Sequence, residues 1–241
     1  MLEDLILENV LFLDIETVPQ YASYQKLPDG VRELWNKKAR IITRNEENPD
    51  DEETYQKAGI YAEFGKIVCI SVGAVVVKDG QLTARLKSFF GHDEKALLSD
   101  FAELLNRRYN QPRQHRLCGH NGKEFDFPYL SRRMLINGIK LPELLNTAGK
   151  KPWEVSHLDT MELWKFGDYK SFTSLPLLAE VFNIPTPKDD IDGSDVGAVY
   201  WEEQDLDRIA VYCQKDVLAV IQLVLRYRRQ DLISPENVFE A

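Results

Sequence analysis

Two apolar segments on either side of a tight-turn signal constrain the fold of this chain most. Lys66–Val77 (KIVCISVGAVVV) and Leu82–Phe90 (LTARLKSFF) flank the tripeptide Lys78-Asp79-Gly80. The dipeptide Asp-Gly favours the short turns that join antiparallel strands, because both of its residues tolerate a left-handed backbone. The sequence therefore predicts a β-hairpin over these residues.

The segments around this hairpin alternate between strand and helix patterns. Val10–Ile15 has the pattern of a buried strand that ends at Glu16. Short strands are also predicted at Arg116–Gly119 and Val155–Leu158, and helices at Glu94–Tyr109, Phe127–Ile136, Ser174–Phe182 (with Ser174 as N-cap) and Asp205–Arg229. This order predicts an α/β layer fold with a mixed sheet.

One segment is long for a connection between two strands. The 241 residues contain no obvious linker, which predicts a single domain over residues 1–241 with a long insertion at about 20–65. The insertion contains a predicted helix around Val31–Ile42 and an acidic run at Glu46–Glu53. Two interpretations stay open: a peripheral, partly mobile insertion and a lid over a substrate.

Composition excludes several classes of protein. No apolar run reaches the roughly 20 residues of a membrane helix, the N-terminus has no signal-peptide pattern, and the three cysteines form no disulfide framework. We therefore expect a reduced, cytoplasmic protein that does not associate with membranes. The net charge of −9 argues against a protein that coats duplex nucleic acid, but not against an enzyme that holds a few nucleotides at a strand end.

The first chemical motif is the pair Asp14 and Glu16 in LFLDIETVP. Residues two apart on a strand project from the same face, about 6.5 Å apart along the chain. Such carboxylates repel each other unless a cation lies between them, and Mg²⁺ and Mn²⁺ favour oxygen ligands. An Asp-x-Glu sequence is more often a solvated pair at a strand end than a metal site. Here the apolar residues VLFL that precede Asp14 favour a metal site.

Two further acidic motifs follow. Asp126, in GHNGKEFDFPYL, stands at the start of a predicted helix, where capping that helix is the alternative function. Phe125 and Phe127 flank Asp126. Two interpretations of these rings stay open: they are core residues, or they stack on a nucleobase beside a metal ligand. Tyr212 and Asp216 lie one turn apart on the last predicted helix, at the edge of its apolar stripe.

Together these motifs resemble those of the DEDDy-type 3′–5′ exonucleases. Asp-x-Glu on a first strand, Asn-x3-Phe-Asp before a helix and Tyr-x3-Asp on a last helix stand in the family's order. Within these exonucleases the chain resembles the proofreading exonuclease domain of family-B DNA polymerases and its stand-alone relatives, and Ala62–Gly73 and Pro185–Val196 share this likeness. The resemblance implies a ribonuclease H-like fold, a mixed five-stranded sheet with helices packed around it.

The resemblance also implies roles for individual residues. Asp14, Glu16, Asp126 and Asp216 would hold two divalent ions, Mg²⁺ or Mn²⁺, and Tyr212 would complete the catalytic set by positioning the attacking water. Thr17 and Asn121 would contact the terminal nucleotide, and Phe125, an aromatic residue beside a metal ligand, is the candidate for stacking on its base. The implied activity releases nucleoside 5′-monophosphates from single-stranded 3′ ends, with DNA favoured over RNA. A proofreading or DNA-repair role would require a separate polymerase or repair partner, since the chain is too short to contain one.

Alternatives from other classes remain. LFLDIETV also resembles the first motif of haloacid dehalogenase-like phosphatases, and Asp189–Asp195 could imitate their later acidic cluster, but Glu16 is wrong for that chemistry. A non-catalytic nucleic-acid-binding or partner-binding module on the same fold is the second alternative. Candidates for backbone contacts, each more often an ordinary solvated charge, are Lys123, Arg132, Arg133, Lys165, Lys170 and Lys188.

Overall fold

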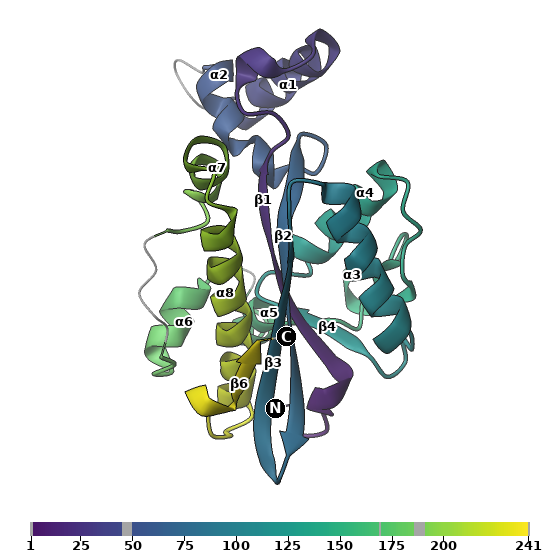
Figure 1. The fold of residues 1–241 in the computed structure, drawn as a ribbon, viewed down its shortest axis with the longest axis vertical. Coiled ribbons are helices and arrows are strands. Elements are labelled where there is room, and N and C mark those ends of the chain that lie inside the picture. Colours follow the sequence, from purple (N-terminus) through teal and green to yellow (C-terminus); the bar gives the residue numbers. More distant parts are fainter. Residues whose placement is uncertain (1, 45–49, 169, 186–190, 241) are drawn as a thin grey trace.

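A six-stranded mixed sheet runs through the middle of the molecule in the order β5-β4-β1-β2-β3-β6 (Figure 1). It is seen in a computed structural model that describes residues 2–44, 50–168, 170–185 and 191–240. β1 pairs antiparallel with β2 and β2 with β3, whereas the pairs β1–β4, β4–β5 and β3–β6 are parallel. The strands are β1 Val10–Pro19, β2 Gly65–Lys78, β3 Gln81–Phe90, β4 Arg116–Gly119, β5 Leu158–Asp159 and β6 Val238–Glu240.

Helices cover both faces of this sheet, which confirms the predicted α/β class (Figure 1). The α-helices are α1 Asp29–Ile42, α2 Asp51–Thr54, α3 Glu94–Arg108, α4 Asp126–Ile136, α5 Thr160–Lys165, α6 Leu175–Val181, α7 Val196–Ala198 and α8 Leu206–Tyr227. Short 3-10 helices are η1 Leu7–Asn9, η2 Tyr24–Lys26, η3 Tyr55–Ile60, η4 Glu143–Leu145, η5 Pro152–Glu154 and η7 Pro235–Asn237, and η6 Val199–Glu203 is a π-helix. Within the described residues, no helix combines the length and apolarity needed to cross a membrane.

The two faces of β1 lead to different cores. Val10 and Phe12 pack with residues of α6 and α8, whereas Leu11, Leu13 and Ile15 pack with residues of α3 and α4. This alternation follows from the two-residue period of a strand. The residues that come next on the α8 face are Asp14 and Glu16, so the strand directs both carboxylates towards α8.

The predicted hairpin is confirmed. β2 and β3 pair from Cys69 with Phe90 to Lys78 with Gln81. The turn residues Asp79 and Gly80 have φ values of 52° and 79°. Positive φ at both central positions is the geometry that the right-handed twist of paired strands favours, and it explains the Asp-Gly sequence.

Other boundaries differ from the sequence-based expectation. The sheet has a sixth strand, β6, and the strand expected at Val155–Leu158 is only Leu158–Asp159, because pairing is limited to Cys118 and Gly119 of β4. β1 continues beyond Ile15 to Pro19 after a register shift between Glu16 and Thr17. Ser174 is the N-cap of α6, but its side chain makes no capping hydrogen bond.

The insertion after β1 packs around a small core of its own. Trp35 of α1 makes edge-to-face contacts with Tyr55 and Phe64, with ring centroids 5.3 and 5.1 Å away. Its indole N–H donates to the carbonyl oxygen of Asp51 at 3.0 Å. The helix expected at Val31–Ile42 is thus confirmed as α1, while residues 46–49 of the acidic run lie outside the described residues.

Candidate metal centre

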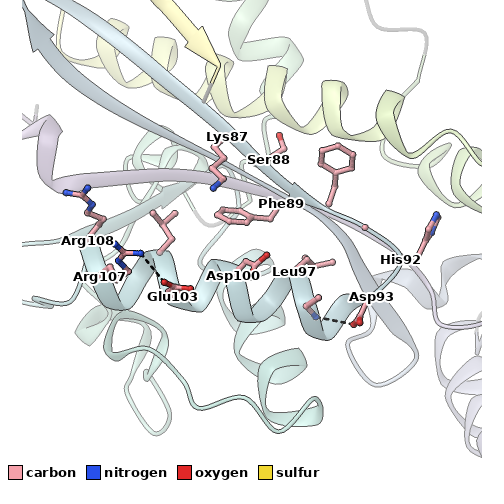
Figure 2. A pocket seen from close by; sticks show the side chains of 14 residues that line it. Lys87, Ser88, Phe89, His92, Asp93, Leu97, Asp100, Glu103, Arg107 and Arg108 are labelled. Atoms are coloured by element: carbon pink, nitrogen blue, oxygen red, sulfur yellow. Dashed lines mark hydrogen bonds and ion pairs between the residues drawn. The ribbon is translucent and has the colours of Figure 1, made fainter.

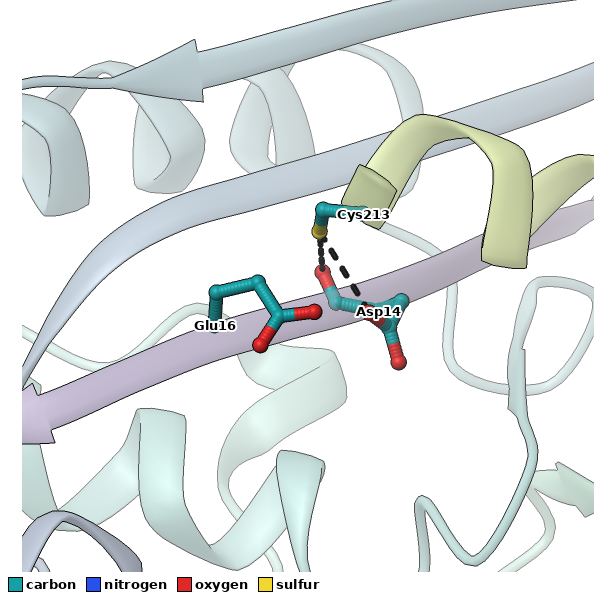
Figure 3. A group of neighbouring side chains, drawn as sticks. All are labelled: Asp14, Glu16 and Cys213. Atoms are coloured by element: carbon teal, nitrogen blue, oxygen red, sulfur yellow. Dashed lines mark hydrogen bonds between the residues drawn. The ribbon is translucent and has the colours of Figure 1, made fainter. Parts of the chain in front are cut away.

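Asp14 and Glu16 lie side by side on β1 beneath α8 (Figure 3). Single ligand atoms of Asp14, Glu16 and Cys213 all lie within 4.8 Å of one another. The Cys213 thiol, from α8, is 3.4 Å from both the backbone carbonyl oxygen and Oδ2 of Asp14. A soft thiol and two hard carboxylates therefore surround one point between the strand and the helix.

Burial and mutual repulsion perturb both carboxyl groups. The pKa of Asp14 is raised well above its usual value, chiefly by burial and then by the charges of Glu16, Asp126 and Asp216. The pKa of Glu16 is raised in the same way, by burial first and then by Asp216, Cys69 and Asp126. No cationic side chain among the described residues opposes either shift. A bound cation is the simplest way to stabilise such a group of charges.

Asp126 reaches the same site from the loop after β4. β4 pairs with β1 only as far as Phe12, so the edge of β1 beyond it is open, and Asp126 Oδ1 accepts the N–H of Ile15 at 3.1 Å. Burial is the largest cause that raises the Asp126 pKa, to about 7, against the lowering effect of backbone N–H donors. Phe125 occupies the N-cap position of α4, so the carboxylate of Asp126 fixes β1 to this loop instead of capping a helix from the N-cap.

Tyr212 and Asp216 complete the group from α8. Both are half-buried, and the phenol forms a hydrogen bond with the Asp216 side chain. Burial first, and then the charges of Asp216, Glu16 and Asp14, raise the pKa of the Tyr212 hydroxyl above its usual range. The phenol therefore stays protonated at neutral pH and can donate a hydrogen bond.

The three expected nucleotide contacts have partners within the chain. The Thr17 hydroxyl forms a hydrogen bond with Tyr129, and the half-buried ring of Phe125 lies 5.3 Å from that of Tyr129. Asn121 has a φ of 63°, in the left-handed region that asparagine tolerates, and its N–H donates to Asp159 Oδ1 at 3.0 Å. Thr17 and Phe125 therefore lie together, whereas Asn121 faces β5.

Sequence reasoning missed two residues here. Cys213 stands three residues before Asp216, a spacing that places two side chains on neighbouring positions of a helix surface, and this was the sequence signal for it. Asp159 accepts the backbone N–H groups of Asn121 and Lys123 at 3.0 Å each and also caps α5. The sequence signal for Asp159 was its position directly after a strand.

Two of the surface cavities that lie outside the carboxylate group differ in their lining. One, of about 720 Å³, is bounded by β3 and α3 and includes Lys87, Asp100 and Arg107 (Figure 2). The other, of about 600 Å³, is lined by Asn121 and Asp159 together with residues of α5. The second is lined by Asn121, Lys123 and Glu124 of the loop that leads to Asp126 at the start of α4.

Comparison with known families gives one match. The model of a family described as "Predicted 3′-5′ exonuclease related to the exonuclease domain of PolB" matches residues 60–237. The matched region contains Asp126, Tyr212 and Asp216, whereas Asp14 and Glu16 precede it. No curated protein matches the chain at a significant level.

Proposed function

The chain belongs to the family of predicted 3′–5′ exonucleases related to the exonuclease domain of PolB, and we propose that it is a metal-dependent 3′–5′ exonuclease. Its substrate is the 3′ end of a single-stranded nucleic acid, with DNA favoured over RNA, and its products are nucleoside 5′-monophosphates. The observation that carries this proposal is the pair of the half-buried Asp14 and the buried Glu16, which lie side by side without a cationic partner among the described residues.

The donor set fits divalent ions that prefer oxygen. Asp14, Glu16, Asp126 and Asp216 offer carboxylates, and each of the last two raises the pKa of Asp14, so all four share one electrostatic site. We assign these four residues as ligands of two ions, Mg²⁺ or Mn²⁺. Two such ions, when bound, supply the charge that activates a water and stabilises the leaving 3′ oxygen of an in-line displacement.

The chain's own residues orient the reaction. Because the Tyr212 hydroxyl keeps its proton and lies beside Asp216, it can hold the attacking water by a hydrogen bond without acting as a base. The Asp126–Ile15 hydrogen bond fixes one ligand to the strand that carries two others. Thr17, Asn121 and Phe125 would contact the terminal nucleotide, and substrate binding would have to rearrange or share the contacts that Thr17 and Phe125 make with Tyr129.

The domain organisation is part of the same proposal. We assign residues 1–241 to a single ribonuclease H-like exonuclease domain, in which residues 20–65 are an insertion. The separate small core around Trp35 supports an insertion that folds as a local unit. A role in proofreading or repair would depend on a separate partner.

The test uses 5′-labelled single-stranded DNA and RNA with Mg²⁺ or Mn²⁺ and an EDTA control. We expect a ladder of products shortened from the 3′ end with one substrate, lost in EDTA and reduced at least about a thousandfold in Asp14→Ala. The matched control is Asp100→Ala, an exposed aspartate on α3 across the sheet, which should retain activity.

Each alternative predicts a different result. Binding of the strand by the wild type and by Asp14→Ala, without shortening in any metal, would identify a non-catalytic binding module. Release of inorganic phosphate from small phosphate esters without shortening would favour the phosphatase, whose second acidic cluster at Asp189–Asp195 lies partly outside the described residues.

A further inference from the structure

We propose that exposed aromatic side chains around the cavity beside Asn121 form a stacking platform for the nucleotides that precede the 3′ end. The platform consists of Trp153, Phe166 and Phe172. This inference rests on the proposed exonuclease function, because that function supplies the single strand. It adds a second binding region that lies outside the group of carboxylates.

The cavity adjoins the loop that leads to the candidate metal centre. Asn121 lines it, and the loop from Asn121 to Phe125 leads directly to Asp126. Asp159, which also lines the cavity, fixes this loop through the N–H groups of Asn121 and Lys123. The loop from Asn121 to Phe125 thus connects the cavity with Asp126, and a strand whose 3′ end lies at the carboxylates would follow this loop.

The platform residues are unusually exposed for their size. Trp153 and Phe166 are each 77% exposed and Phe172 is 65% exposed. Trp153 follows Pro152, which lines the cavity, and Phe166 lies between Lys165 and Gly167, which both line it. Large apolar rings that are exposed to water next to residues lining a cavity indicate a binding surface, because their burial by a ligand is favourable.

The backbone at Phe166 gives independent support. Phe166 ends α5 in the left-handed conformation, with φ of 44°, and Gly167 follows with φ of 88°. A bulky side chain at positive φ is strained, and a helix commonly ends with glycine at such a position. The exposed ring recovers little of this strain by packing, since its recorded ring contact is Trp164 at 6.5 Å. Strain that packing does not explain is characteristic of functional positions.

The charges around the cavity favour stacking over a phosphate groove. Lys123 pairs with Glu162 at 2.7 Å, and Lys165 lies 3.9 Å from Glu124. Lys165 also lies over the ring of Phe172 at 4.2 Å, and Lys151 lies over Trp153 at 5.2 Å. Because carboxylates accompany Lys123 and Lys165, the surface combines aromatic rings with little net positive charge. Unpaired bases, which expose their π-faces, fit such a surface better than a duplex does.

The dimensions suit a short stretch of strand. α5 spans Thr160–Lys165 between its N-cap Asp159 and its C-cap Phe166, so these two residues lie about 10 Å apart along the helix, the length of roughly three stacked nucleotides. The platform would thus contact the nucleotides just upstream of those held at the metal ligands.

The binding test uses a 5′-fluorescein-labelled 12-nucleotide DNA, and the matching RNA, with protein carrying Asp14→Ala so that the probe stays intact. Fluorescence anisotropy should show that Phe166→Gly and Trp153→Ala each raise Kd about tenfold, while Phe166→Tyr and Trp153→Phe stay close to the parent. The matched control, Phe239→Ala, removes a 45% exposed ring from β6 and should leave Kd unchanged. Phe166→Gly should melt at or above the parent's temperature, which separates lost binding from lost folding.

A second measurement uses protein with an intact Asp14. The ratio of kcat/KM for the 12-nucleotide strand to that for a dinucleotide should fall about tenfold in Phe166→Gly, because only the longer substrate reaches the platform. Absence of cleavage by the wild type would contradict the exonuclease function, while anisotropy would still test the platform. An unchanged Kd in both Trp153→Ala and Phe166→Gly would overturn the platform. A wild-type dimer that Phe166→Gly converts to a monomer in gel filtration would also overturn it, and would assign this surface to a second copy of the chain.

Discussion

Two groups of buried carboxylates lie on opposite faces of the same sheet, and their surroundings differ. Glu94, 8% exposed, begins α3, and Glu16, 7% exposed, faces α8. The Glu94 carboxylate accepts from Arg133 Nε at 2.8 Å and Nη2 at 2.6 Å, from Asn137 Nδ2 at 2.9 Å and from the N–H of Ile67 at 2.8 Å. Its charge is compensated within the chain.

Asp14 and Glu16 have no such compensation. The groups that act on their pKa values are other carboxylates and thiols, and burial raises both pKa values. Glu94 and Glu16 are thus almost equally buried but differ in the groups that surround them. A buried acid with a guanidinium and amide donors holds the fold together, whereas buried acids that repel one another require a ligand that the chain does not supply.

The largest stability effect should come from breaking the compensated group. Arg133→Met leaves Glu94 buried without its cation and also removes the hydrogen bonds from Arg133 to Ala62 O and Gln20 Oε1. We expect the free energy of unfolding to fall by about 3–5 kcal/mol, measured by urea denaturation. Arg107→Met is the control, since it removes an exposed pair with Glu103 and should cost less than about 0.5 kcal/mol. A similar small loss in Arg133→Met would remove the distinction between the two groups.

Arg133 also shows where sequence reasoning reaches its limit. The sequence suggested Arg133 as a backbone-contacting candidate, and the structure shows that this was wrong, because the side chain is 4% exposed and paired with Glu94. Nothing local to either residue reveals a partner 39 positions away. Lys188, another candidate, lies outside the described residues.

What could be predicted followed from local periodicity. The two-residue period of β1 placed Asp14 and Glu16 on one face, and the helical period placed Tyr212 and Asp216 one turn apart. The tie between Asp159 and the Asn121 loop, the thiol of Cys213 beside Asp14, and the pairing of β6 with β3 depend on contacts between distant segments. Periodicity carries no information about which distant surfaces meet.

Metal addition should stabilise the fold more at neutral pH than in acid. Carboxyl groups with raised pKa stabilise the metal-free fold below the unfolded values near 4, and this contribution is lost as pH rises through the folded values, about 7 for Asp126. Mg²⁺ or Mn²⁺ at a hundred times Kd should therefore add about 2.7 kcal/mol at pH 7.5 and much less at pH 5. Thermal denaturation measures this, and Asp14→Asn serves as the control that should lose the effect. An equal gain in both proteins would place the ion elsewhere.

The buried His157 should give a pH dependence of stability opposite to that of the carboxyl groups. His157 Nδ1 accepts the N–H of Leu117 at 3.2 Å and Nε2 donates to Leu144 O at 2.8 Å, and burial lowers the His157 pKa to about 4. The neutral ring contributes stability above its unfolded value of about 6.5, and this contribution is lost as pH falls towards 4. The stability advantage of wild type over His157→Gln should shrink by roughly 2 kcal/mol between pH 7.5 and pH 5. Urea denaturation in EDTA at both values measures it, and a constant difference would mean that the ring is protonated in the fold.

Removing one carboxylate charge should change the free energy of unfolding only slightly, but with opposite sign at Asp14 and at Glu94. In EDTA at pH 7.5, Asp14→Asn keeps the shape of the side chain and removes one of the mutually repelling charges, so the protein should gain about 1 kcal/mol. Glu94→Gln removes the charge that Arg133 and Asn137 surround, so the same chemical change should destabilise the fold. Differential scanning calorimetry on both variants gives the two signs. Stabilisation of both would mean that Arg133 does not offset the burial of Glu94, and destabilisation of both would mean that the Cys213 thiol already stabilises the Asp14 charge, which would weaken the case for a cation at that position.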